Sequence, residues 1–177
     1  MNTQGKRCDI LQLGNPCLRR IAQPITDFTS EQSRQLIADL KATLARTEGV
    51  GLAAPQIGES FQAVIIASRP TSRYPKAPEM LPVCMLNPGM TVLDERQQKD
   101  WEGCLSIPGI RAKVPRYPKI KVHYQDEQGE SHSMRLEGFV ARVFQHEFDH
   151  LQGLVYLDRV ETNLDIISES EFLKQVV

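Results

Sequence analysis

The stretch QHEFDHLQG, residues 145–153, contains the pattern H-E-x-x-H at His146, Glu147 and His150. Histidines four residues apart lie on one face of a helix, where both rings can bind a single metal ion. The glutamate beside the first histidine is then placed to act as a general base. A catalytic zinc-type site normally has three protein ligands and one open position. A third ligand is therefore expected elsewhere in the chain.

The surrounding sequence predicts that this pattern lies on a buried helix. Residues 138–152 (GFVARVFQHEFDHLQ) carry apolar side chains at helical spacing, and Gly153 follows as a C-terminal stop. Two other interpretations are a pair of hydrogen-bonded core histidines and a chance pattern on a solvated helix. The position of Glu147 and the apolar surroundings favour a metal site over both.

Composition limits the class of protein. The chain has 177 residues, with 21 basic and 22 acidic side chains and a net charge of −1. This balance gives no electrostatic reason to expect a nucleic-acid or anionic-membrane partner, and no nucleic-acid motif is present. No apolar run is long enough to span a bilayer, and MNTQGKRCDI is not followed by the apolar core of a secretory signal. We expect one domain, residues 1–177, with its four cysteines reduced in a cytosol-like compartment.

Periodicity predicts an α+β fold, with short antiparallel strands around the central metal-binding helix. Residues 30–48 predict an N-terminal helix, with Thr29 and Gln32 as its cap and Gly49 as its stop. Residues 161–177 predict a weaker C-terminal helical segment. The predicted strands are FQAVIIAS (61–68), VCMLNP (83–88), MTVLDE (90–95) and a hairpin of KIKVHYQ (119–125) with SHSMRLEG (131–138). A proline-rich exposed loop is expected at residues 69–82.

Downstream residues are poor candidates for the third ligand. A metzincin protease needs H-E-x-x-H-x-x-G-x-x-H, and Tyr156 stands where its last histidine should be. A thermolysin-like site needs a downstream glutamate. Glu161, Glu169 and Glu171 follow, but in a polar tail without a clear buried pattern.

Upstream, WEGCLSIPG (101–109) places Cys104 between Gly103 and Leu105 in a predicted tight loop. A lone cysteine is more often a small buried residue than a ligand. Beside an H-E-x-x-H that lacks a third ligand, Cys104 becomes the stronger candidate, since a thiolate is a good metal ligand.

Three segments together resemble the signature motifs of the peptide deformylase family: GVGLAAPQIG (49–58), EGCLS (102–106) and QHEFDHLQG (145–153). They occur in the family's order and at its approximate spacing, and the resemblance covers roughly residues 5–160. It implies a hydrolase that removes the formyl group from the N-terminal formyl-methionine of nascent polypeptides and releases formate.

The resemblance also implies the metal and the catalytic groups. Cys104, His146 and His150 would hold one divalent ion, Fe(II) in the cell, for which Zn(II), Ni(II) or Co(II) can substitute in preparations. Glu147 would be the base. The Gln56 side chain and the Leu105 backbone N–H would stabilise the oxyanion.

The substrate-binding residues are expected at the motif positions. Val50 and Gly51 would pair with the peptide backbone, and the methionine side chain would lie against Val50, Leu105, Phe139 and Val143. The alternative for the glycines around Val50 is that they only shape a turn.

Three arginines are interpreted separately. Arg111 and Arg116 resemble residues that hold the cysteine loop and meet the substrate backbone, with solvated surface charge as the alternative. Arg142 departs from the apolar residue that many members carry, and we predict that it pairs with Glu102 or Glu48 while its methylene stem lines the pocket.

Two further interpretations compete with a deformylase: a zincin-like endopeptidase in which Cys104 is structural, and a non-catalytic relative that binds peptide N-termini. The resemblance implies formyl-methionyl nascent peptides at the ribosome exit as partners and the bacterial cytoplasm as location. The chain is expected to be a monomer.

Overall fold

The computed structural model describes residues 3–176. Among these residues it contains three α-helices: α1 (Glu31–Leu44), α2 (Gly138–Leu151) and α3 (Glu169–Val176). The strands are β1 (Gly51–Ala53), β2 (Ala63–Ile66), β3 (Val83–Asp94), β4 (Gln98–Cys104), β5 (Ile107–Arg116), β6 (Lys119–Gln125), β7 (Ser131–Glu137) and β8 (Ile166–Ser168). Short 3-10 turns are η1 (Pro16–Arg19), η2 (Ala54–Ile57), η3 (Tyr156–Arg159) and η4 (Asn163–Asp165). No helix in this described part is long and apolar enough to cross a membrane.

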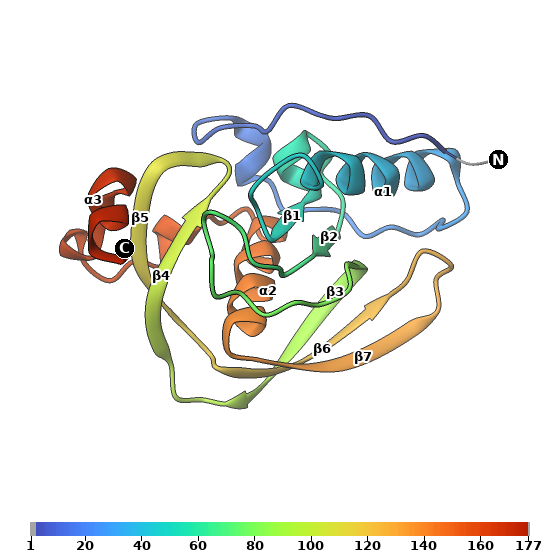
Figure 1. The fold of residues 1–177 in the computed structure, drawn as a ribbon. Helices are drawn as coiled ribbons and strands as arrows, with labels where there is room; N and C mark the ends of the chain where they lie inside the picture. The colour runs from blue at the N-terminus through green and yellow to red at the C-terminus, as the bar shows by residue number, and fades with distance from the viewer. Residues whose placement is uncertain (1–2, 177) are drawn as a thin grey trace.

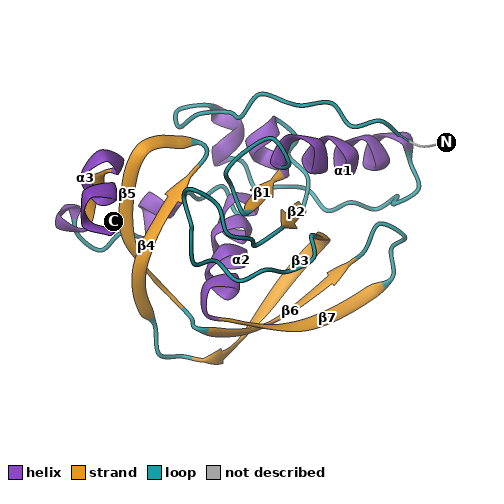
Figure 2. Ribbon diagram, viewed as in Figure 1, coloured by secondary structure: helices purple, strands orange, loops and turns teal. Residues whose placement is uncertain are grey.

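The strands form two antiparallel sheets around α2. One sheet has the order β1-β2-β3-β6-β7 and the other the order β4-β5-β8. Figure 1 shows α2 at the centre, with α1 above it, the β6–β7 hairpin below and the β4–β5 hairpin to the left. In Figure 2 the loop between β2 and β3 passes in front of α2. The predicted α+β fold with a central helix is confirmed.

The helix α2 is buried because its apolar side chains reach the five-stranded sheet. Phe144 and Leu151 are fully buried and lie in the same core cluster as Val64, Met85 and Ile120 of that sheet. Burying a large apolar side chain stabilises a fold by about 1.5–3 kcal/mol. The packing therefore fixes how α2 is rotated, and with it the direction of the two histidines.

Glycines define both ends of α2. Gly138 (φ 57°) starts the helix after β7, and Gly153 (φ 72°) follows its last turn. A Cβ at Gly153 would lie 2.7 Å from the carbonyl oxygen of Arg19, so a side chain there would clash with backbone as well as strain φ. The predicted glycine stop is thus found at its predicted position.

The N-terminal helix α1 is capped one residue later than predicted. The Ser30 hydroxyl accepts from the Ser33 N–H at 3.1 Å, while the Thr29 hydroxyl donates to Asp27. The helix ends at Leu44, and the Thr47 hydroxyl donates to the Leu44 carbonyl at 3.0 Å. A local side-chain bond therefore stops the helix before Gly49.

Two strand predictions need correction. The segments 83–88 and 90–95 form one strand, β3, because a bulge between Leu86 and Gly89 carries the chain past Pro88. Asn87 lies in that bulge at φ 47°, and its side chain bonds both backbone groups of Ile25 at 2.8 Å. The hairpin of β6 and β7 has the predicted bounds to within one residue.

The C-terminal segment is also only partly helical. Residues 166–168 form β8, which pairs with β5 at Arg111↔Ile167, and only then does α3 begin. Phe172 of α3 packs edge-on against Trp101 of β4, with ring centroids 5.5 Å apart. A sheet edge, invisible to local periodicity, decides the conformation of Ile167.

Candidate metal centre and pocket

The structure brings Cys104, His146 and His150 together. One ligand atom from each lies within 4.8 Å of the others, and all three side chains are buried. The Cys104 sulfur is 3.5 Å from Nε2 of His150. Cys104 ends β4 and is followed by a two-residue turn into β5, so the sulfur is held by a hairpin that the sequence pattern did not predict. Soft sulfur and imidazole nitrogen are ligands that suit first-row divalent metals.

Glu102 orients the first histidine. Its Oε2 lies 2.9 Å from Nδ1 of His146, which leaves Nε2 as the nitrogen free to ligate. The same carboxylate accepts from Arg116 at 2.8 and 3.1 Å and from Arg142 at 3.0 Å. The ring of Tyr156 stacks on His146 with centroids 5.8 Å apart. This supporting role of Glu102 was missed from the sequence, although it adjoins Gly103 and Cys104 in the EGCLS motif.

The surroundings shift the pKa values of the two histidines in opposite directions. For His150, burial and the charges of His146 and Arg116 hold the pKa well below its ordinary value. For His146, burial opposes protonation, but the charge and hydrogen bond of Cys104 and the hydrogen bond of Glu102 outweigh it and raise the pKa. A metal at His146 would therefore compete with a proton for the ring.

Glu147 lies beside the ligands without a partner of its own. It is 5% exposed, and its Oε2 is buried with no hydrogen-bond partner among the described residues. Burial raises the pKa of Glu147 to about 7. A Cβ at Gly51 would lie 2.5 Å from Oε1 of Glu147. Gly51 therefore leaves room for this carboxylate. The sequence had suggested pairing with the peptide backbone or shaping a turn as reasons for this glycine, and neither includes this contact.

Gln56 points its amide nitrogen at the sulfur. The Ala53 N–H donates to Gln56 Oε1 at 2.9 Å, which leaves Nε2 to donate to Cys104 Sγ at 3.5 Å and Ser106 Oγ at 3.2 Å. Ser106 also donates its N–H to the sulfur at 3.4 Å. Ser106 was missed from the sequence, although it is the last residue of EGCLS. Leu105 occupies the turn between Cys104 and Ser106.

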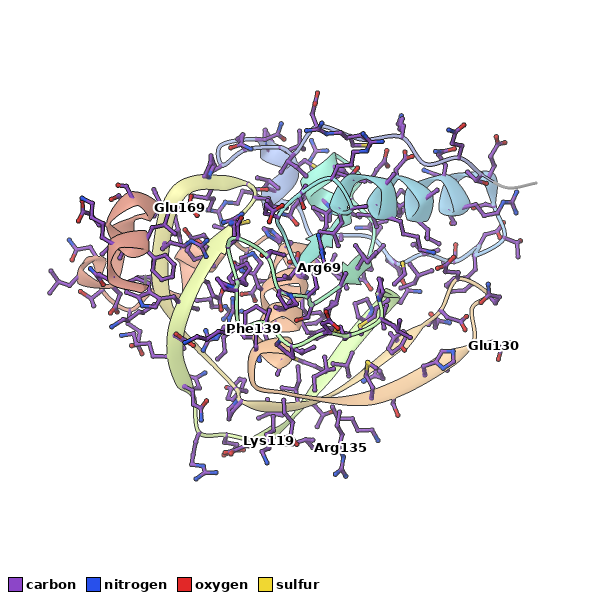
Figure 3. All side chains as sticks on the ribbon, viewed as in Figure 1. Arg69, Lys119, Glu130, Arg135, Phe139 and Glu169 are labelled. Atoms are coloured by element: carbon purple, nitrogen blue, oxygen red, sulfur yellow. The ribbon has the colours of Figure 1, made fainter. Side chains whose placement is uncertain are left out.

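A pocket opens next to the three candidate ligands, and both polar and apolar side chains line it. Most of the substrate-binding residues expected from the sequence line it: Val50, Gly51, Leu105, Phe139 and Val143. Gln56, Cys104, His146 and Glu147 also line it. Figure 3 labels Phe139, one of the lining residues, at the start of α2.

Arg111 does not reach this pocket, contrary to the expectation that it meets the substrate. Its side chain is 1% exposed and donates to Glu169 from Nε and Nη2 at 3.1 and 2.9 Å. A Cβ at Gly103 would lie 2.8 Å from the Arg111 side chain. The pairing of β5 with β8 draws the guanidinium behind the cysteine turn, towards the C-terminal segment.

The other two arginines are buried as well. Arg116 bridges Glu102 and Asp149, and the charge of Glu102 helps raise the pKa of Arg116 despite burial. Arg142 pairs with Glu102, one of the two predicted partners, and also donates to the carbonyls of Val114 and Gln98 at 2.6 Å each. Solvated surface charge, the alternative interpretation of Arg111 and Arg116, is wrong for both, since both are buried and paired.

The protease interpretations lack a third ligand. The Tyr156 hydroxyl donates to the Ile110 carbonyl at 3.1 Å. The downstream glutamates are engaged elsewhere: Glu161 with Lys99, Glu169 with Arg111 and Glu171 with Lys174.

Comparison with known proteins gives one family. The model of the polypeptide deformylase family matches residues 7–164. Peptide deformylase 2 of Nostoc sp. is 49% identical over 167 residues, which cover 94% of this chain and 93% of the relative. Peptide deformylase 1 of Nitrosomonas europaea is 43% identical over 151 residues, covering 85% and 86%.

Solved structures give the same family. A class I type b peptide deformylase from Acinetobacter baumannii, crystallised with Met-Ala-Ser, has a TM-score of 0.84 at 38% identity and covers 89% of this chain and 100% of its own. The peptide deformylase from Thermotoga maritima has a TM-score of 0.78 at 38% identity, covering 89% and 99%.

These matches extend over nearly all of the described residues and include all three motifs around the metal centre. The chain therefore belongs to the polypeptide deformylase family, and it is a metal-dependent hydrolase that removes the N-formyl group from nascent polypeptides.

Proposed function

We propose that Cys104, His146 and His150 hold one divalent ion and that Glu147 is the general base of deformylation. One observation carries this proposal. Three buried donor atoms lie within 4.8 Å of one another, next to a buried carboxylate that has no partner among the described residues. All but His150 face the pocket.

The donor set fits a first-row divalent metal. When bound, such an ion supplies Lewis acidity towards water and towards the formyl oxygen. We propose Fe(II) in the cell, with Zn(II), Ni(II) or Co(II) as substitutes in preparations, because these residues match the family's motifs. A cysteine ligand tempers the acidity and makes a ferrous site sensitive to oxidation.

Glu147 moves the protons. As a carboxylate it takes a proton from the attacking water, and it then delivers that proton to the leaving nitrogen. In the metal-free site burial raises the pKa of Glu147 to about 7, so this carboxyl group can gain and lose a proton. The product is formate and a free amine on methionine.

Gln56 and Leu105 stabilise the oxyanion that forms on the formyl carbon. The Gln56 amide is fixed by the Ala53 N–H, so its N–H groups are already directed at the site before substrate arrives. The backbone N–H of Leu105 lies in the turn directly after the ligand sulfur. Both donors are neutral and keep their donor character across the working pH.

The pocket holds the formyl-methionine. We propose that Val50 and Gly51 pair with the peptide backbone and that Val50, Leu105, Phe139 and Val143 surround the methionine side chain. These residues line the pocket beside the ligands. Met-Ala-Ser bound to the Acinetobacter baumannii relative supports a peptide with N-terminal methionine as the occupant.

We further propose that residues 1–177 form a single domain that acts as a monomer at the ribosome exit in the bacterial cytoplasm. One family model spans residues 7–164 without interruption, and the relatives named above are bacterial. The net charge of −1 argues against strong general attraction to RNA.

The test compares formyl-Met-Ala-Ser with unformylated Met-Ala-Ser-containing peptides. We expect formate from the first substrate only. Internal cleavage would support a zincin-like peptidase, and binding without any product would support a non-catalytic relative.

The ligand assignment has its own test. Cys104→Ala is expected to lower metal content and abolish formate release, whereas Cys17→Ala, a buried cysteine outside the pocket, keeps both. Full metal content and activity in Cys104→Ala would refute the assignment.

A further inference from the structure

The mouth of the pocket carries an arginine, Arg73, from the loop 69–82. With its neighbour Tyr74 it lines the pocket, and its side chain is 19% exposed. At the inner end Cys104 is 2% exposed and His150 is fully buried. The gradient of exposure places Arg73 at the outer end, where a bound peptide passes into solvent.

The carboxylate nearest to Arg73 is shared with a second arginine. Glu169 Oε1 accepts two hydrogen bonds from Arg111, at 3.1 and 2.9 Å, while Nη2 of Arg73 remains 3.7 Å away. Nε of Arg73 is buried without a hydrogen-bond partner among the described residues. Figure 3 labels Glu169 beside the β4–β5 hairpin. One carboxylate therefore faces two guanidinium groups, and Arg73 is the less well paired of them.

Other charges at the rim do not cancel this excess. Arg69 donates to three backbone carbonyls, and Glu48 accepts from the residue before Arg73. Arg111 is fully engaged with Glu169 and does not line the pocket. The mouth therefore presents the guanidinium of Arg73, whose Nε has no hydrogen-bond partner among the described residues.

We infer that Arg73 makes the enzyme favour formylated peptides with an acidic side chain soon after the methionine, and that Glu169 weakens this preference. The inference rests on the proposed function: the formyl group lies at the ligands and the methionine lies against Phe139 and Val143. The residues that follow then pass the mouth, where a guanidinium attracts a carboxylate and repels an ammonium group.

The expected preference is moderate. At about 8 Å in a water-like dielectric, one charge pair changes a binding constant by roughly twofold, so attraction of a carboxylate and repulsion of an ammonium group together give about fivefold at low ionic strength. It should shrink at about 0.5 M salt, where the screening length falls to a few ångströms.

The experiment measures kcat/KM for three peptides with amidated C-termini: formyl-Met-Ala-Glu, formyl-Met-Ala-Gln and formyl-Met-Ala-Lys. We expect a ratio of about five between the Glu and Lys peptides, with the Gln peptide between them. Arg73→Gln brings the ratio close to one. Lys76→Gln removes the same charge from an exposed site in the same loop and leaves the ratio unchanged. Glu169→Gln raises the ratio.

The outcomes separate this inference from the proposed function. Formate from all three peptides at equal rates, or a ratio that survives Arg73→Gln, overturns the inference alone. No formate from any peptide contradicts the proposed function instead. If Arg73→Gln does not fold, as judged by thermal unfolding, the salt dependence of the ratio in the unmodified protein decides: a ratio independent of salt refutes the role of charge.

Discussion

Two buried carboxylates flank His146, and their surroundings differ completely. Glu102, behind the ligands, is held by Arg116, Arg142 and the His146 ring. Burial would raise the pKa of Glu102, but the charge of Arg116 and the hydrogen bonds from His146 and Arg116 lower it. Glu147, in the pocket, has no such partner, and burial raises its pKa to about 7. Glu102 is thus fixed as an anion that orients the His146 ring, while Glu147 can exchange a proton.

The largest effect is expected when Glu147 can no longer exchange a proton. Glu147→Gln keeps the shape of the side chain but cannot accept a proton, so kcat/KM should fall by about 10²–10⁴-fold. Metal analysis of the purified variant should give unchanged metal content, since the proposed ligands are Cys104, His146 and His150. A variant that lost its metal, or that kept full activity with it, would contradict the division between the two carboxylates.

Removing the charge of Glu102 should act on stability first. Glu102→Gln leaves Arg116 and Arg142 as buried cations without their shared anion, and breaking such a network destabilises a fold by about 3–5 kcal/mol. Urea unfolding measures the loss. Glu161→Gln is the control, because it breaks an exposed pair with Lys99 that is worth at most about 1 kcal/mol. Equal losses in the two variants would show that the buried network adds nothing.

The pH dependence of stability should differ between Glu147 and its amide in chelator-treated protein. Because the pKa of Glu147 is raised from 4.5 to about 7, its contribution to stability is fully present below pH 4.5 and is lost as the pH rises through 7. Between pH 4 and pH 8, the free energy of unfolding of Glu147→Gln should therefore rise by roughly 3 kcal/mol relative to that of the unmodified protein. Urea unfolding at both pH values checks this; parallel stability curves would mean that the pKa is not raised.

The smallest effect is expected for Arg142, which pairs with Glu102 and also lines the pocket. Arg142→Leu removes a donor from Glu102 and from the carbonyls of Val114 and Gln98, at a loss of about 2 kcal/mol. It also makes the pocket wall more apolar, so the relative kcat/KM for methionine and other apolar first residues should change. Unchanged stability would contradict a role for Arg142 in holding Glu102, and unchanged selectivity would contradict a role in the pocket wall.

Sequence predicted the elements whose signals are local. The spacing of apolar residues on α2, the glycine after it and the turn between β6 and β7 all depend on neighbours in the chain. The three motifs also predicted which residues meet: Cys104 and His150, 46 positions apart, lie 3.5 Å from each other.

Most of the features that the sequence did not predict depend on contacts between segments that are far apart in the chain. The β4–β5 hairpin was missed although its two strands are neighbours in the chain. Ile167 was assigned to a helix because pairing with β5, more than fifty residues earlier, decides its conformation. Arg111 was placed in the pocket for the same reason. Its partner, Glu169, belongs to the C-terminal segment, and no spacing rule joins the two positions.

The origin of the ligands in two separate elements has a consequence for assembly. Cys104 lies in the β4–β5 hairpin and both histidines lie on α2. A bound ion would therefore cross-link α2 to the three-stranded sheet, as a disulfide would. The cross-link closes a loop of 46 residues and restricts the unfolded chain accordingly. The same ion that serves hydrolysis would thus also be a reversible cross-link between α2 and the three-stranded sheet, added to the hydrogen bonds and ion pairs that already join them.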